Sequence, residues 1–129
     1  MVRPSAVLVV LVCAALGASA ARAPSPGGAE GRVLYTRYCS SCHGLDGDGH
    51  GPVASVLSRP PTDLRRLGDR FGQPLDADRL ARWIDGREDV AAHGTREMPV
   101  WGERFRAPQG GIDPRIRSII DHLQAIQAR

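Results

Sequence analysis

The chain has 129 residues, which is room for one small domain, and its formal net charge at pH 7 is only +3. A charge this small does not favour non-specific binding to nucleic acid, so we expect no nucleic-acid partner. Aromatic residues make up only 5% of the chain, whereas glycine and proline contribute 15 and 10 residues. A small chain with so little aromatic bulk is expected to gain stability from a metal, a disulfide or a cofactor.

The N-terminus has the pattern of a secretory signal peptide. Arg3 is followed by an apolar stretch and then by small residues that suit cleavage after Ala20, or as late as Ala23. The apolar stretch is short for a membrane span of about 20 residues. We therefore expect no integral membrane span after cleavage, whereas an uncleaved signal would leave the chain associated with the membrane.

These features predict three parts of the chain. Residues 1–20 are the expected signal peptide, 21–30 are a flexible leader, and 31–129 form the folded domain. The expected location is the periplasm, or more generally the outside of the cytoplasmic membrane. Cys13 lies inside the signal, where it is interpreted as a small apolar residue that is removed.

The first helix is predicted over about residues 30–38. Gly31, Leu34, Tyr35 and Tyr38 fall on one side of it. A glycine on a packing face lets two backbones approach closely, so Gly31 is the expected crossing point with another helix.

Cys39, Cys42 and His43 follow this helix as a C-x-x-C-H motif. A disulfide is the default for an exported pair of thiols, but so short a loop is a poor structural staple. A thioredoxin-like site needs a strand before the motif, and a zinc site needs further ligands, yet no cysteine follows Cys42. The spacing suits haem instead: Cys39 and Cys42 would form thioethers to its vinyl groups, and His43 would bind the iron.

A glycine-rich loop follows His43 and is expected to turn closely around the haem edge, because glycine tolerates the backbone angles required there. Asp46, Asp48 and His50 resemble the start of an EF-hand loop. The twelfth position, which should be a bidentate glutamate, is Leu57, so calcium is not expected.

The remaining chain predicts two more main helices and one short helix. The short helix is expected near 62–68, and a main helix spans 76–86 between an aspartate-rich first turn and a glycine. The last helix begins at Asp113 and Pro114, a capping residue followed by the position where proline is favoured. No period-2 pattern of any length occurs, so strands are not predicted and the fold class is all-α.

With these features the exported part of the chain resembles the class I c-type cytochromes. The stretch GRVLYTRYCSSCH resembles the family's opening, REMPVWG resembles its sixth-ligand loop, and the last helix resembles its closing helix. The resemblance implies a cytochrome c fold wrapped round one covalently attached haem c, with His43 and Met98 as the axial ligands of the iron. It also implies that the Pro52 carbonyl accepts a hydrogen bond from the His43 ring.

Other residues are weaker candidates. Tyr35 and Trp101 are expected in the haem pocket or the core, and an arginine of 59–66 could contact a haem propionate. His50 and His93 are interpreted as solvated loop residues rather than iron ligands. At position 122 the family usually carries an aromatic residue, and this chain departs from that with a histidine that we expect to pack between helices.

Histidine and methionine together fill the coordination of haem iron, which leaves only one-electron chemistry. The sequence therefore predicts an electron carrier rather than an enzyme, with a redox protein as donor and another as acceptor. The chain would act as a monomer or as a docked subunit of a dehydrogenase or oxidase. A five-coordinate sensor or peroxidase-like protein is the alternative if Met98 does not bind the iron.

Overall fold

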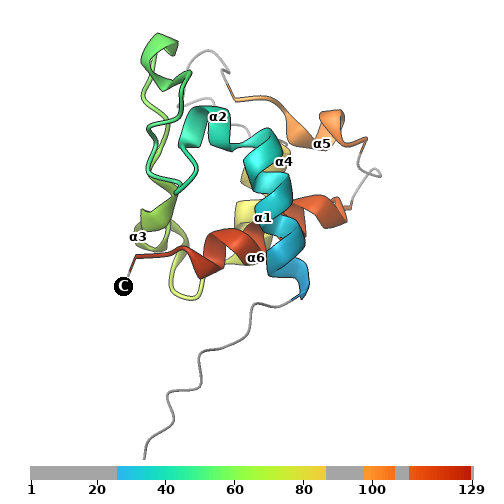
Figure 1. The fold of residues 1–129 in the computed structure, drawn as a ribbon. Coiled ribbons are helices and arrows are strands. Elements are labelled where there is room, and N and C mark those ends of the chain that lie inside the picture. The colour runs from blue at the N-terminus through green and yellow to red at the C-terminus, as the bar shows by residue number, and fades with distance from the viewer. Residues whose placement is uncertain (1–25, 87–97, 107–110, 129) are drawn as a thin grey trace, which may run out of the picture.

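The computed structural model describes residues 26–86, 98–106 and 111–128. Within these ranges the chain is helical and has no strand, which confirms the all-α prediction. Figure 1 shows the helices arranged around the crossing of the first and the last. The elements are α1 (Pro26–Tyr38), α2 (Ser40–His43), the 3-10 turns η1 (Ala54–Val56) and η2 (Leu64–Arg66), α3 (Gly68–Phe71), α4 (Ala77–Asp85), α5 (Trp101–Arg104) and α6 (Pro114–Ala125). None of the helices in the described ranges combines the length and the apolar character that crossing a membrane requires.

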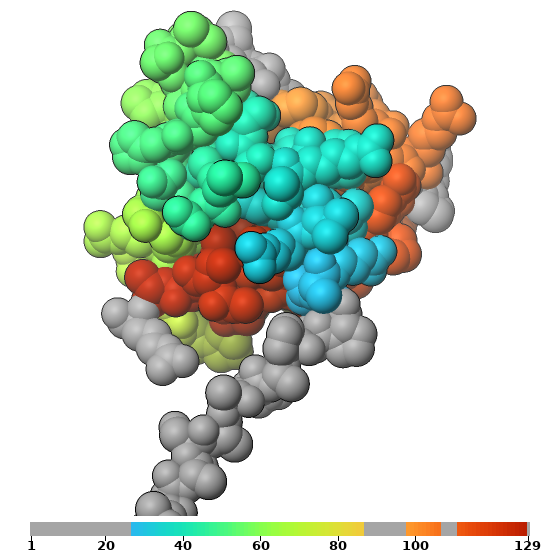
Figure 2. All heavy atoms as spheres, viewed as in Figure 1, coloured from blue at the N-terminus to red at the C-terminus, as the bar shows by residue number. Residues whose placement is uncertain are grey.

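Helices α1 and α6 form the centre of the fold and lie side by side on the face seen in Figure 2. Gly31 lies against the backbone carbonyl of Ser118, and a Cβ added at residue 31 would collide with that oxygen. One turn further, the rings of Tyr35 and His122 have centroids 5.0 Å apart. Gly31 is therefore the crossing point of α1 with α6, and His122 packs between the two helices, as the sequence predicts.

Helix α1 begins earlier than its pattern suggests. It starts at Pro26, so the second half of the expected leader 21–30 is helical. The cause is tertiary contact, because Gly27 lies against Asp121 and the Ser118 hydroxyl donates to Glu30 Oε2 at 3.0 Å. The added turn of α1 is thus supported by α6.

The cap that begins α6 and the glycine that ends α4 are those predicted, whereas Asp76, expected in the first turn of α4, is its N-cap. The Asp76 carboxylate accepts a hydrogen bond from the Arg79 N–H, and Gly86 ends α4 in the left-handed conformation with φ 87°. The Asp113 carboxylate accepts from the Arg115 N–H at the start of α6, with Pro114 as its first residue. Both helices turn an apolar face to the core, which includes Leu80, Ala81, Ile84, Ile116, Ile119, Ile120 and Leu123.

The short helix expected near 62–68 is present as η2 and α3. Helix α5 has no counterpart among the predicted elements, and it contributes Trp101 to an aromatic cluster. The Trp101 ring lies 5.5 Å from both Tyr38 and Phe105, measured between centroids. This cluster joins the end of α1 to the segment that follows residue 98.

Candidate functional site

The site begins where α1 passes into α2. The Cys39 N–H donates to the Tyr35 carbonyl at 2.8 Å, which continues the hydrogen bonding of α1, and the His43 N–H donates to the Cys39 carbonyl at 2.9 Å. Cys39 and His43 therefore mark the two ends of one helical turn that also holds Cys42. Both cysteines are partly buried free thiols. The turn brings two thiols and one imidazole to the end of the central helix.

The environment of Cys39 keeps its thiol protonated. Burial, and secondarily the neighbouring Cys42, raise the pKa of Cys39 to about 12. Redox-active C-x-x-C pairs depend on the opposite effect, a thiol pKa lowered so that the thiolate attacks. The structure thus gives no support to a thioredoxin-like exchange site.

His43 is held by one backbone carbonyl. Its Nδ1 atom lies 3.0 Å from the carbonyl oxygen of Thr62. Since a carbonyl can only accept, this hydrogen bond requires the proton on Nδ1 and leaves the lone pair of Nε2 available for a metal. Burial lowers the pKa of His43 and is only partly opposed by the Thr62 carbonyl, so the ring is neutral near pH 7. A neutral imidazole held in this way has the state that a metal ligand needs.

Thr62 takes the role that was expected of Pro52, and that expectation is corrected. Pro52 is exposed, and its loop pairs with α2 instead: the Gly51 N–H donates to the Cys42 carbonyl and the Val53 N–H to the Ser41 carbonyl. The signal in the sequence is the pair of prolines at 60–61, because proline keeps the chain out of a helix and leaves nearby carbonyls free to accept elsewhere.

Tyr35 supports the first residue after His43. The side chain is fully buried, and its hydroxyl donates to the Gly44 carbonyl at 2.6 Å. Burial raises the pKa of Tyr35, so the hydroxyl remains a donor. The three glycines 44, 47 and 49 have φ between 77° and 86°, as expected for a tight loop at this point.

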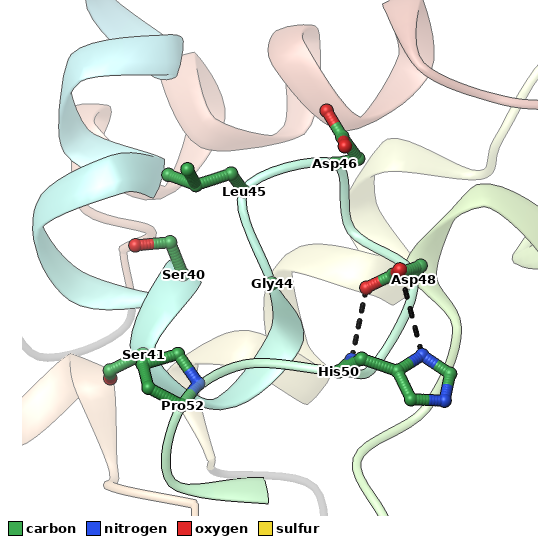
Figure 3. A pocket seen from close by; sticks show the side chains of 8 residues that line it. All are labelled: Ser40, Ser41, Gly44, Leu45, Asp46, Asp48, His50 and Pro52. Carbon is green, nitrogen blue, oxygen red and sulfur yellow. Dashed lines mark hydrogen bonds and ion pairs between the residues drawn. The ribbon is translucent and has the colours of Figure 1, made fainter.

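The loop and α2 border an open hollow of about 510 Å³, shown in Figure 3. At its margin Asp48 accepts from the His50 backbone N–H at 3.0 Å, and its carboxylate lies 3.6 Å from Nδ1 of the exposed His50 ring. Across the described ranges, no three His, Cys, Asp or Glu side chains gather to hold a metal ion. The hollow is lined by Ser40, Ser41, Gly44, Leu45, Asp46, Asp48, His50 and Pro52, and neither cysteine nor His43 belongs to its lining.

The other candidates stand apart from this turn. Met98 lies three residues before α5 with 43% of its surface exposed, so its role as a ligand stays a prediction. Trp101 is buried in the aromatic cluster with Tyr38, and its contact with a haem likewise remains a prediction. His93 and the signal peptide lie outside the described residues.

The donor set fits a covalently bound haem. Two thiols separated by two residues match the two vinyl groups, and the adjacent neutral imidazole has its Nε2 lone pair free for the iron. An all-α fold centred on the crossing of α1 and α6, with this turn at the end of α1, defines a c-type cytochrome domain.

Comparison with known families agrees with this class. The chain belongs to the family described as cytochrome c oxidase, cbb3-type, subunit III, whose model matches residues 26–110. Membership implies covalently bound haem c with its iron and a function in electron transfer, and it confirms the resemblance to c-type cytochromes. No curated protein and no solved structure matches the chain.

Proposed function

We propose that the chain carries single electrons between redox proteins outside the cytoplasmic membrane, through a haem bound at the C-x-x-C-H turn. The observation that supports this most directly is the hydrogen bond from His43 Nδ1 to the Thr62 carbonyl, beside two half-buried thiols. This hydrogen bond keeps the proton on Nδ1 and leaves Nε2 free to bind iron, in a chain whose family carries haem c.

Each residue of the site has a defined part in this proposal. Cys39 and Cys42 form the thioethers, and His43 binds the iron through Nε2. The Thr62 carbonyl fixes the ring orientation and raises the basicity of the imidazole. Met98 would supply a neutral thioether as the second ligand, which would favour the reduced iron and raise the potential. Bound haem would supply a one-electron couple, and with His43 and Met98 both bound to it the iron would have no open site for a substrate.

A dedicated subunit of a terminal oxidase is the second candidate for the same chemistry. The family description, which names a subunit of cytochrome c oxidase, favours it. Purification of the native protein under mild conditions, followed by mass spectrometry of what accompanies it, separates the two. Stoichiometric recovery with oxidase subunits supports the dedicated subunit, and recovery as a free monomer supports a diffusing carrier.

A five-coordinate sensor or peroxidase-like protein is the third candidate, and the exposure of Met98 is the observation that favours it. Carbon monoxide discriminates, because it binds reduced haem iron only where an axial position is open. Rapid and complete binding to the reduced protein indicates a sensor or peroxidase. Absence of binding indicates a carrier.

The decisive experiment is expression of the full chain in a host that attaches haem c and exports proteins. The purified protein should show the optical bands of a six-coordinate c-type haem with and without reductant, and its mass should include one haem. N-terminal sequencing of the periplasmic fraction should show cleavage after Ala20 or Ala23. A colourless product with the bare polypeptide mass would contradict the proposal.

A further inference from the structure

We infer that Gln127, at the C-terminal end of the chain, is a positioning residue for His43. Its side chain holds the segment that carries the Thr62 carbonyl, and through this carbonyl it sets the orientation and basicity of the imidazole. The inference rests on the proposed function in one respect, namely that His43 binds the haem iron.

Gln127 joins three parts of the backbone with its single amide group. Its Nε2 donates to the Leu64 carbonyl and to the Leu123 carbonyl, both at 2.8 Å, and its Oε1 accepts from the Gly68 N–H at 3.2 Å. The next residue adds a backbone bond, because the Ala128 N–H donates to the Arg65 carbonyl at 2.8 Å. The C-terminal end of α6 is thereby fastened to η2 and to the start of α3, beside which it runs in Figure 1.

The segment held in this way leads directly to Thr62. Asp63 caps η2, accepting from the Arg65 N–H at 3.0 Å, and its carboxylate also pairs with the Arg65 guanidinium at 2.8 Å. The same segment is also bound to the loop after His43, because the Leu64 N–H donates to the Gly47 carbonyl at 2.7 Å. Residues 63–65 are therefore fixed between the loop after His43 and Gln127, and the Thr62 carbonyl has little freedom to move.

Loss of the Gln127 contacts removes one of these two attachments. The Leu64 carbonyl and the Gly68 N–H would then bind water, and the segment from 62 to 68 would depend on the Gly47 contact and on the backbone bond from Ala128 to Arg65. A longer or less aligned hydrogen bond from His43 Nδ1 makes the imidazole a weaker base. A weaker base stabilises oxidised iron less, so the reduction potential rises.

Gln124 offers a matched control. It lies near the end of α6, three residues before Gln127, and its Oε1 accepts from the Leu75 N–H at 2.8 Å. Both glutamines thus attach backbone outside α6 to the C-terminal part of the chain through a side-chain amide. Only Gln127 contacts the segment next to Thr62, whereas Gln124 contacts a residue beyond α3.

The test compares Gln127→Ala and Gln124→Ala in the haem-loaded chain. Voltammetry gives the reduction potential, and NMR gives the exchange rate of the His43 Nδ1 proton with solvent. We expect Gln127→Ala to raise the potential and to speed the exchange by about fivefold, which corresponds to roughly 1 kcal/mol of lost hydrogen bonding. Gln124→Ala should change neither quantity, although it also removes a partly buried hydrogen bond.

Unchanged potential and exchange in Gln127→Ala would overturn the inference, and so would equal shifts in the two variants. Should Gln127→Ala fail to accumulate, Gln127→Glu carries the same expectation, since it keeps the acceptor for Gly68 and loses both donated bonds. Failure of the proposed function is recognised separately. If the proposed function is wrong, His43→Ala will retain the six-coordinate spectrum. If only the inference is wrong, His43→Ala will lose that spectrum and Gln127→Ala will behave like the wild type.

Discussion

Gly31 of α1 lies directly against the backbone carbonyl of Ser118 in α6, so closely that a Cβ at residue 31 would overlap the carbonyl oxygen. The same Cβ would also lie 3.1 Å from the Cβ of His122. Because the obstacle is backbone, a larger residue can be accommodated only if the two helices move apart. The distance between the helices that carry the core is thus set by the absence of one side chain.

Gly31→Ala is expected to destabilise the protein by at least about 2 kcal/mol, since overpacking at a rigid contact exceeds the gain in helix propensity. Chemical denaturation of the haem-loaded protein measures the free energy of unfolding. Arg32→Ala is the control, because its side chain is exposed on the same helix and should change stability little. A stability of Gly31→Ala equal to that of the wild type would show that the helices separate at little cost.

The crossing point and the helix caps could be predicted because each depends on a local pattern. Aspartate before a helical period predicts the starts of α4 and α6, and a glycine on a packing face predicts the crossing. The C-x-x-C-H motif likewise carries its chemistry within five residues. The candidate haem-attachment turn was therefore accessible from the sequence alone.

The parts that could not be predicted depend on contacts between distant segments. Thr62 lies 19 residues from His43, and its carbonyl reaches the ring because the Leu64 N–H is bound by Gly47. The prolines at 60–61 indicate that carbonyls in this stretch are free to accept, but they do not identify which carbonyl is used. The early start of α1 at Pro26 has the same origin, since α6 supplies the contacts that favour it.

Tyr35→Phe is expected to cost about 1 to 3 kcal/mol, because the Gly44 carbonyl would lose its hydrogen-bond donor in a buried position. Tyr38→Phe is a matched control, since that side chain is only partly buried and no hydrogen bond joins its hydroxyl to another described residue. Thermal unfolding of the two variants measures the difference. Equal losses in both would mean that the contact from Tyr35 to Gly44 contributes nothing specific.

His122 is expected to make the protein less stable in mild acid. Its Nε2 atom is buried and has no hydrogen-bond partner in the described part of the chain, and its ring packs on Tyr35. Burial, and secondarily the charge of Arg32, lower the pKa of His122 below its ordinary value of 6.5. In the unfolded chain the imidazole takes up a proton at that ordinary value, whereas in the folded protein it stays neutral to lower pH.

The unfolded state therefore binds more protons below about pH 6.5. As the pH is lowered through this range, the free energy of unfolding decreases by at most about 1.4 kcal/mol per pH unit. His122→Phe keeps an aromatic ring at this position and cannot titrate, so the corresponding part of the slope should disappear. Unfolding free energies at pH 8.0 and pH 5.5 measure it. An identical pH dependence in the variant and the wild type would contradict the prediction.

Met98→Ala tests the second axial ligand. The Met98 side chain is 43% exposed, and a ligand in this position would have to turn its sulfur from that surface toward the iron. If it does, the alanine variant should have a lower potential, by a sizeable fraction of the roughly 0.8 V over which axial ligands set haem potentials. The reduced variant should also bind carbon monoxide, which the wild type should exclude.

Met98→His provides the complementary change. An imidazole in the same place would keep the iron six-coordinate and closed to carbon monoxide, and would lower the potential because it lacks the preference of a thioether for reduced iron. Val100→Ala, two residues further along the same segment, should leave both properties unchanged. If Met98→Ala and the wild type have the same potential and both bind carbon monoxide, the sixth position is open in the native protein. Gas sensing or peroxide chemistry would then explain the site better than electron transfer alone.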